Sequence, residues 1–276
     1  MKTKKLLFGF PMLLLLICCN EKQTTPSDSV KSTQDVNSKQ KLVDLSHAYS
    51  DETVYWVTAR EFHLDTVFKG HTEKGYYYCA NNFTTAEHGG THLDAPIHFV
   101  ENGQSVEEIQ LEKLIGSAIK IDVSSKTQNN PDYLIEIEDL KAWEKAEKIK
   151  IPKESIVLLE TGFSKYYPDK TKYMGTAERG ENAVEKLHFP GLSKEAAQWL
   201  VDERDINAIG IDTPSIDYGQ SEFFESHIIL LSQNIPIFEN LNNLNQLPNI
   251  NFQIIALPMK IKNGSGAPLR IVAMLE

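Results

Sequence analysis

The chain has 276 residues, of which 41% are hydrophobic and 24% are charged. That composition excludes a collagen-like protein, a wholly disordered chain and a protein with many membrane spans. Asp and Glu number 38 against 28 Lys and Arg, which makes the formal net charge −10. Non-specific binding to nucleic acid depends on Lys and Arg that neutralise phosphates. Because the sequence has no basic tract of that kind, we expect no nucleic-acid partner.

Residues 1–19 have the pattern of an export signal. Lysines at positions 2, 4 and 5 precede an apolar run over 6–19, which is shorter than the roughly 20 residues that a membrane-spanning helix needs. A charged start and a short apolar run are typical of a secretory signal peptide. The run ends Leu-Ile-Cys-Cys, which resembles a bacterial lipobox with Cys19 as the lipidated residue. The alternative is an ordinary signal peptide that contains cysteine.

A lipidated Cys19 implies an exported lipoprotein, held to a membrane only by its acyl anchor and facing the periplasm or the cell surface. Residues 20–40 contain two valines and no aromatic residue. Such a segment cannot bury enough apolar surface to offset the entropy that it would lose on ordering. We therefore predict a disordered tether over 20–40, followed by one folded domain over 41–276.

The domain shows an alternation of strand-like and helix-like segments. Short β-type runs mostly end at Gly, Pro, Asn or Ser, and apolar residues occur at helical spacing in three places. This pattern predicts a single α/β domain in which helices flank a mixed β-sheet. The predicted strands are 42–45, 76–83, 118–123, 155–160, 206–211, 235–238, 252–257 and 269–274, and the predicted helices are 138–147, 222–231 and a helix from the N-cap Ser193 to about 203.

Three further features have local interpretations. Cys79 alternates with aromatic residues in a predicted strand, which favours a buried, inert thiol. The polar insertion 164–187 favours a solvated loop or a lid. The Gly-rich segment 263–268 predicts a long hairpin loop between the last two strands.

The segment 87–99 contains the residues that best indicate chemistry. Three histidines and one aspartate fall within eleven residues, all at even positions: His88, His92, Asp94 and His98. An extended chain would place them on one side, but it would separate His88 from His92 by about 13 Å. Ligands of one metal ion lie only about 3 Å apart. The backbone must therefore bend, and Gly89-Gly90 and Pro96 are suited to that.

Imidazole and carboxylate together favour Zn²⁺, Mn²⁺ or Fe²⁺ over Ca²⁺ and Mg²⁺, which prefer oxygen ligands. Three protein ligands with open positions are typical of a catalytic metal site. The alternative for any one of these histidines is a surface residue on a loop. Four such residues in this spacing, between Gly-Gly and Pro, favour the metal.

The pattern His-x-Gly-Thr-His-x-Asp-x-Pro-x-His, over 88–98, resembles the signature of the cyclase family, which includes bacterial kynurenine formamidase and isatin hydrolase. The resemblance covers essentially 42–276 and implies the swivelling β/α type of fold. Further landmarks are 189–193, 210–217, His227, 239–241 and 264–270.

The resemblance implies that His88, His92 and Asp94 bind a first divalent metal. Asp94, His227 and Glu239 would bind a second, with Glu239 touching both ions. Zn²⁺ is the first expectation and Mn²⁺ the alternative. The residues themselves leave other options for the second group, since a lone histidine on an amphipathic helix can be a core residue. A carboxylate that ends an apolar strand can pair with an arginine instead.

His98 is expected to be the general acid and base, because histidine exchanges protons near neutral pH. A dication lowers the pKa of its bound water toward about 7, which supplies a nucleophile for an amide carbonyl. Trp56 falls roughly where the formamidases have an aromatic residue against the substrate ring. The alternative for Trp56 is a core residue.

We thus predict a metal-dependent amidohydrolase of the arylformamidase kind, which converts N-formylkynurenine to kynurenine and formate, a reaction of tryptophan catabolism. One alternative is hydrolysis of a cyclic amide or lactone, as in isatin hydrolysis. The other is a non-catalytic lipoprotein that binds metal or a small aromatic ligand. The resemblance also implies a homodimer.

Overall fold

The structure is a computed structural model, and it describes residues 41–275. The predicted signal peptide 1–19, its Cys19 and the predicted tether 20–40 lie outside the described residues. Within 41–275, no helix combines the length and the apolar character needed to cross a membrane.

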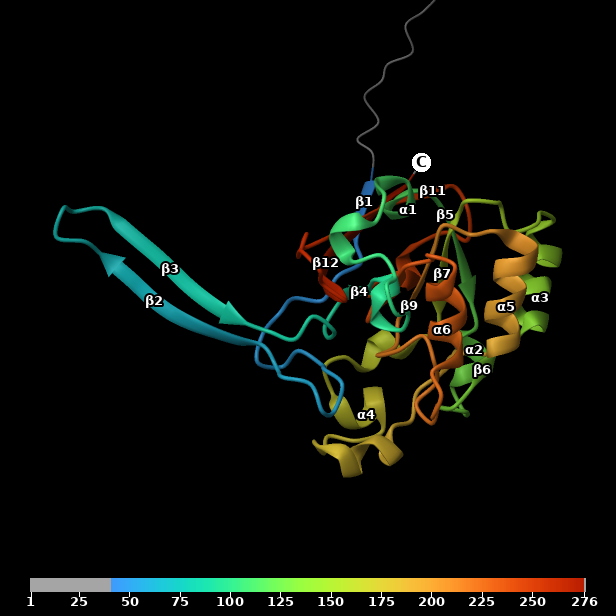
Figure 1. The fold of residues 1–276 in the computed structure, drawn as a ribbon, viewed down its shortest axis with the longest axis horizontal. Helices are drawn as coiled ribbons and strands as arrows, with labels where there is room; N and C mark the ends of the chain where they lie inside the picture. The colour runs from blue at the N-terminus through green and yellow to red at the C-terminus, as the bar shows by residue number, and fades with distance from the viewer. Residues whose placement is uncertain (1–40, 276) are drawn as a thin grey trace, which may run out of the picture. The chain divides into compact units, whose positions relative to one another are not determined.

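An eight-stranded mixed sheet forms the centre of the domain (Figure 1). Its order is β1-β12-β11-β5-β7-β9-β10-β4, and β4 also pairs with β12, so the sheet closes into a barrel-like ring. β5, β7, β9 and β10 are parallel to one another, whereas the other pairs are antiparallel. The strands are β1 (Lys41–Asp44), β4 (His92–Asp94), β5 (Ile115–Asp122), β7 (Ile156–Glu160), β9 (Ala208–Ile211), β10 (Ile237–Glu239), β11 (Phe252–Pro258) and β12 (Gly266–Leu275).

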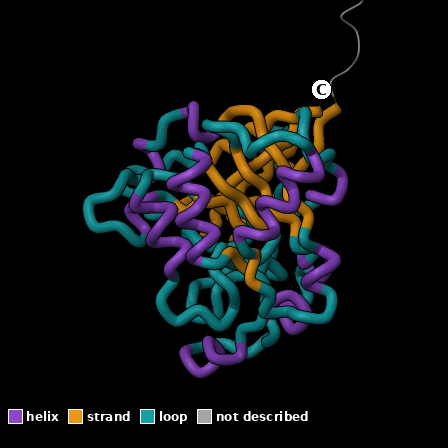
Figure 2. Tube along the Cα trace, turned by 90° about the vertical axis from the view of Figure 1, so that its right-hand side faces the viewer, coloured by secondary structure: helices purple, strands orange, loops and turns teal. Residues whose placement is uncertain are grey.

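Three helices cover one face of the sheet: α3 (Ile137–Glu147), α5 (Lys194–Arg204) and α6 (Glu225–Ser232). Ser193 caps α5, since its Oγ accepts a hydrogen bond from the Ala196 N–H at 3.1 Å. The prediction of a mixed sheet flanked by helices is confirmed, with all three helices at their expected places. The view in Figure 2 shows the strands between helices, with loop-rich chain beneath them.

The remaining elements are short. They connect the strands or line the loops around the site. They are α1 (Leu111–Leu114), α2 (Ser124–Thr127), α4 (Lys170–Met174), the paired strands β6 (Leu134–Ile135) and β8 (Gly191–Leu192), and the 3₁₀ turns η1 (Pro96–His98), η2 (Val106–Glu108), η3 (Phe163–Tyr166), η4 (Glu181–Lys186) and η5 (Leu244–Gln246).

The sheet separates two hydrophobic clusters. Successive side chains of a strand point to opposite faces, so β7 contributes Ile156 and Leu158 to one cluster and Val157 and Leu159 to the other. The first cluster also holds Phe238 and apolar side chains of β4, β11 and β12. The second holds the inner faces of α3, α5 and α6. The first four residues of β7 are therefore all apolar, as expected of a strand covered on both faces.

The insertion 164–187 is not a solvated loop, contrary to the sequence-based interpretation. Tyr173 and Met174 of α4 are buried, and together with Phe163 and Phe189 they belong to a third hydrophobic cluster. Tyr173 also donates hydrogen bonds to Asp212 O and Asn240 Oδ1, both at 3.0 Å. Polar residues dominate the insertion, but a few apolar residues fix it to the domain.

β2 (His63–His71) and β3 (Tyr77–Thr84) form a separate two-stranded hairpin that projects from the domain (Figure 1). The predicted strand 76–83 is confirmed, but β2 was not predicted because its polar and charged residues weaken the strand pattern. Cys79 is exposed, so the expectation of a buried thiol was wrong. Alternation with aromatic residues indicates burial only where another layer covers the strand.

Candidate active site

The pairing of β4 with β10 places the first polar side chains of the site. These strands are antiparallel, and their register sets His92 opposite Glu239. Leu93 points into the cluster inside the sheet, so His92 and Asp94 on either side of it point to the opposite face. His92 Nε2 lies 3.2 Å from Asp94 Oδ1 and 3.5 Å from Glu239 Oε2. Strand alternation and register thus bring three buried polar groups together.

His88 joins this group from the bend before β4. Gly90 has φ of 57°, a left-handed conformation that favours glycine. A β-carbon on Gly89 would overlap the Tyr55 ring, so the chain can approach that ring only as glycine. The bend brings the His88 and His92 ring centroids to 5.4 Å, and His88 Nδ1 lies 2.7 Å from Asp94 Oδ1. The predicted bend at the two glycines is confirmed.

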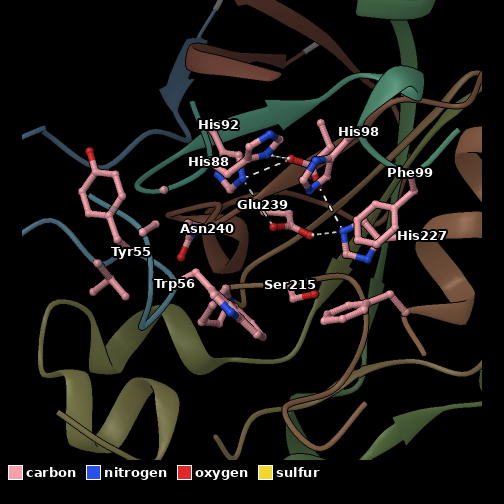
Figure 3. Close-up of a pocket in the computed structure, with 16 residues that line it drawn as sticks. Tyr55, Trp56, His88, His92, His98, Phe99, Ser215, His227, Glu239 and Asn240 are labelled. Atoms are coloured by element: carbon pink, nitrogen blue, oxygen red, sulfur yellow. Dashed lines mark hydrogen bonds and ion pairs between the residues drawn. The ribbon is translucent and has the colours of Figure 1, made fainter. Parts of the chain in front are cut away.

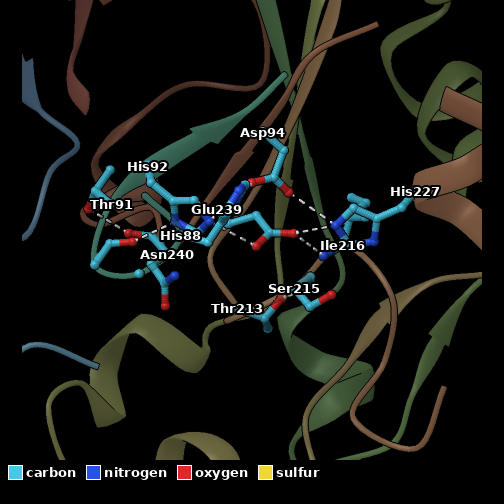
Figure 4. Close-up of polar contacts among 12 residues, drawn as sticks. His88, Thr91, His92, Asp94, Thr213, Ser215, Ile216, His227, Glu239 and Asn240 are labelled. Atoms are coloured by element: carbon cyan, nitrogen blue, oxygen red, sulfur yellow. Dashed lines mark hydrogen bonds and ion pairs between the residues drawn. The ribbon is translucent and has the colours of Figure 1, made fainter. Parts of the chain in front are cut away.

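α6 supplies His227 from the other side of the carboxylates (Figure 4). His227 Nε2 lies 3.1 Å from Asp94 Oδ2 and 3.2 Å from Glu239 Oε1. Its Nδ1 lies 2.6 Å from Asp217 Oδ2. Although burial opposes it, the hydrogen bonds to Asp217 and Asp94 raise the pKa of His227 well above its usual value. His227 is therefore part of a polar cluster and is not an apolar core residue.

Two groups of side chains, which share Asp94, are arranged as metal ligands. One group is His88, His92 and Asp94, and the other is Asp94, His227 and Glu239. In each group, one ligand atom per residue lies within 4.8 Å of the others. Nitrogen and carboxylate donors in this combination suit a divalent cation of the Zn²⁺ or Mn²⁺ kind. The structure thus brings all five predicted ligands together, and Glu239 of the second group also lies 3.5 Å from His92 of the first.

His98 stands beside these ligands at the end of η1, the 3₁₀ turn that Pro96 begins. Its ring stacks on His88, with centroids 3.8 Å apart and planes 18° apart, and it belongs to neither group of ligands. Burial, together with the nearby imidazoles of His88 and His227, lowers the pKa of His98 to about 3. The His98 ring is therefore neutral near pH 7.

The ligand groups and His98 open into one cavity of about 330 Å³ (Figure 3). Trp56 lies in its wall, in edge-to-face contact with Phe189 at 6.4 Å and Phe224 at 6.1 Å between ring centroids. Trp56 therefore lines the cavity, and its role as a substrate contact stays a prediction. The apolar lining consists of Val54, Trp56, Ala59, Phe99, Pro214 and Phe224.

Several supporting residues escaped sequence reasoning. Asp217 holds His227, whereas Ser265 Oγ lies 2.9 Å from His88 Nε2 and donates to Glu87 Oε2 at 2.6 Å. Phe224 lines the cavity next to α6. Asp217 and Ser265 fall within the landmark segments 210–217 and 264–270, which was the signal available. Nothing in the spacing shows which residue of such a segment meets a histidine.

Known proteins resemble this chain over most of its length. The Cyclase family model matches residues 43–218. Isatin hydrolase from Roseibium aggregatum is 29% identical over 209 residues, which cover 73% of this chain and 76% of that protein. Kynurenine formamidase from Bacillus anthracis is 25% identical over 232 residues, which cover 84% and 96%.

The fold agrees with these sequence matches. The solved structure of isatin hydrolase A from Ralstonia solanacearum superimposes with a TM-score of 0.78 at 31% identity, covering 86% of this chain and 92% of that one. The match to the family model includes His88, His92, Asp94 and His98, whereas His227 and Glu239 lie beyond its end at residue 218. The chain therefore belongs to the Cyclase family and, like these relatives, is a hydrolase.

Proposed function

We propose that the protein hydrolyses a non-peptide C–N amide bond of a small aromatic substrate, with N-formylkynurenine, which yields kynurenine and formate, as the nearest reaction. One observation carries the proposal. Two overlapping groups of metal ligands and a neutral histidine face a single cavity whose other walls are largely aromatic and apolar. The names of the relatives, a formamidase and an isatin hydrolase, support the same type of bond.

Different side chains would bind the metal, transfer the proton and hold the substrate ring. His88, His92, Asp94, His227 and Glu239 would hold the divalent cation or cations. Such a cation lowers the pKa of bound water and polarises a carbonyl oxygen. His98 lines the cavity and stacks on the ligand His88, and from this position it would take a proton and return it to the leaving nitrogen. Trp56 and Phe224 would hold the aromatic ring of the substrate.

The test is formate release from N-formylkynurenine by the purified protein after reconstitution with Zn²⁺ or Mn²⁺, with metal content measured on the same sample. We expect turnover that a chelator abolishes. Trp56→Ala should raise KM more than it lowers kcat, because it removes contact area from the ring. Bound metal without turnover of this substrate would exclude formylkynurenine and retain the metal site.

Opening of a cyclic amide or lactone, as in isatin, is the second candidate. Apart from the ligand groups and His98, no ionisable side chain with a full charge lines the cavity in the described part of the chain. A neutral, compact ring fits such walls without any partner for an amino-acid group. Ring opening of isatin, followed by its change in absorbance on the same preparation, compares the two substrates directly.

Three further properties belong to the same proposal. The metal would be Zn²⁺, with Mn²⁺ as the alternative. The resemblance of the segment before Cys19 to a lipobox supports an exported, membrane-anchored lipoprotein. The resemblance to the family supports a homodimer.

A further inference from the structure

Asn240 follows the proposed ligand Glu239 directly after β10 and lines the same cavity (Figure 3). It belongs to neither group of ligands, and no step of the proposed hydrolysis involves it. The residue is only 2% exposed. Burying an amide costs free energy unless its polar atoms have partners. The partners of the Asn240 side chain therefore indicate what the cavity binds.

The backbone of Asn240 is held in one conformation. Its φ of 54° lies in the left-handed region, which asparagine adopts more readily than most other residues. The Asn240 N–H donates to Thr213 O at 2.9 Å, and its carbonyl oxygen accepts from Thr91 Oγ1 at 2.7 Å. Non-glycine residues in this region persist where surrounding contacts fix them, and they occur often at functional sites. The direction in which the Asn240 side chain leaves the backbone is thus fixed.

The side-chain amide has one end that the protein holds and one end that it leaves free. The buried Tyr173 hydroxyl donates to Asn240 Oδ1 at 3.0 Å. Figure 4 shows this amide oxygen pointing away from the ligand side chains. In the described part of the chain, no oxygen accepts a hydrogen bond from the amide nitrogen. Because an amide nitrogen carries two donors and no acceptor, Asn240 offers N–H groups to a molecule in the cavity.

The position of Asn240 suits a part of the substrate other than the attacked amide. In the proposed reaction, the metal ligands and His98 serve the attacked carbonyl and the leaving nitrogen. His98 stacks on the ligand His88, and Figure 3 shows it on one side of Glu239 with Asn240 on the other. The Asn240 amide would therefore meet a further acceptor on the substrate.

An uncharged carbonyl oxygen is the acceptor that fits. Apart from the ligand groups and His98, no ionisable side chain with a full charge lines the cavity in the described residues, so the cavity has no counter-ion for a charged acceptor. Both candidate substrates carry a ketone on the ring carbon next to the one that bears the amide nitrogen. A site built to donate a hydrogen bond to such an oxygen discriminates strongly against analogues that lack it.

We propose that Asn240 is a specificity-determining residue whose amide N–H donates to this ring ketone, and that Tyr173 is the positioning residue that orients the amide. The substrates would be aromatic amides with a ketone on the neighbouring ring carbon. The inference rests on the proposed function, because it takes the cavity to be the substrate site of the hydrolase.

The test measures binding without turnover, by isothermal titration calorimetry on the metal-loaded protein. The two probes are 2-aminoacetophenone and 2-ethylaniline, in which a methylene group replaces the ketone. Asn240→Gly keeps the left-handed backbone and removes the amide, whereas Asn240→Asp keeps the shape and removes the donor. Asn243→Gly is the matched control, because Asn243 also has a left-handed φ of 56° but donates to Asp44 O and does not line the cavity.

We expect the unchanged protein and Asn243→Gly to bind the ketone more tightly than the ethyl probe. In Asn240→Gly and Asn240→Asp this preference should fall by about ten-fold, because the ketone oxygen loses its donor. Tyr173→Phe should lose a smaller part of the preference, since it frees the amide to rotate but keeps the N–H groups. Metal content measured on each sample shows whether the ligand groups are intact.

Equal affinity for the two probes in the unchanged protein would overturn the proposal. So would a preference for the ketone that survives in both Asn240 variants, even where they lose activity, because the amide would then act on the attacked carbonyl. Formate release from N-formylkynurenine on the same samples tests the hydrolase assignment separately. No release, together with a preference that depends on Asn240, would reject that substrate and keep the role of Asn240.

Discussion

Each histidine among the proposed ligands has one ring nitrogen held by the protein and the other directed at the carboxylates. His92 Nδ1 lies 2.9 Å from Gly90 O, and His227 Nδ1 lies 2.6 Å from Asp217 Oδ2. In His88 the roles are reversed, with Nε2 held by Ser265 Oγ at 2.9 Å. A hydrogen bond to one nitrogen fixes the tautomer and leaves the other nitrogen free for a metal. The site is therefore set to bind through His88 Nδ1, His92 Nε2 and His227 Nε2.

Asp217→Asn tests this orientation. The carboxylate accepts the His227 ring proton and also the backbone N–H groups of Ser226 and His227 at the start of α6. We expect metal affinity to fall by about 10- to 100-fold, measured by competition with a chromogenic chelator. Asp132→Asn is the matched control, because Asp132 holds the exposed His188 in a similar pair. Equal loss of affinity in both variants would contradict the role of Asp217.

His98→Ala separates proton transfer from metal binding. His98 belongs to neither ligand group and its imidazole is neutral, so its loss should leave the metal content unchanged. We expect kcat to fall by about 10²- to 10⁴-fold, the usual contribution of a positioned acid and base. His188→Ala is the control, since that histidine lies on the surface. Full turnover in His98→Ala would exclude His98 as the proton carrier, and an unchanged ligand-binding phenotype would favour the non-catalytic binder.

At the residue scale, the sequence predicted what lies within one segment. His88, His92, Asp94 and His98 could be recognised because a bend in eleven residues is enough to join them. His227 is 133 residues from Asp94, and only the resemblance to a family connected the two. The hydrogen-bond partners Asp217 and Ser265 could not be predicted, because tertiary contacts decide which hydroxyl or carboxylate reaches a given ring nitrogen.

Among the elements, local pattern and depth of burial decided what could be predicted. β7 begins with four apolar residues and was predicted, as were the three helices with their polar outer faces. β4 has three residues, and two of them are the polar proposed ligands His92 and Asp94, so it lacks the apolar run that would reveal a strand. Cys79 in the strand 76–83 was predicted to be buried because the local pattern does not show whether another layer covers the strand. Both failures come from elements that serve a site or a surface and not the core.

The junction between β7 and β9 provides a pH-dependent prediction at this scale. Asp212 follows β9, and its buried carboxylate accepts hydrogen bonds from the Thr161 N–H and the Gly162 N–H, which fixes the loop after β7. Burial raises the pKa of Asp212 to about 6 from 3.8, although these hydrogen bonds lower it. The folded state thus binds the carboxyl proton of Asp212 more tightly than the unfolded state. At a pH between these two pKa values, unfolding releases that proton.

The contribution of Asp212 to stability should therefore be greatest below its unfolded pKa and fall as pH rises toward about 6. A shift of about 2 units corresponds to about 3 kcal/mol in the free energy of unfolding. Relative to Asp212→Asn, the unchanged protein should lose about that much between about pH 4 and pH 7, measured by urea unfolding. The lost hydrogen bonds of the variant add an offset at every pH. Parallel curves for the two proteins would show that Asp212 does not titrate in this range.

Across the whole molecule, the site joins parts of the chain that are far apart in sequence. The five proposed ligands come from the bend before β4, from β4 itself, from α6 and from β10. β4 is the strand that closes the sheet by pairing with both β10 and β12. A cation held by these residues would therefore connect the closing strand to a covering helix. The unfolded chain cannot offer the same set of ligands in one place.

Metal removal should for this reason lower thermal stability. A ligand that binds only the folded state stabilises it by about 4 kcal/mol when its concentration is 1,000 times Kd. For a domain of this size each kcal/mol changes Tm by about 2–4 °C, so chelation should lower Tm by about 8–16 °C. Differential scanning fluorimetry with Zn²⁺ or with a chelator measures the change. His92→Ala should show little response to either, because it removes a ligand at the strand that closes the sheet. A similar Tm shift in that variant would mean that the cation stabilises the protein from another position.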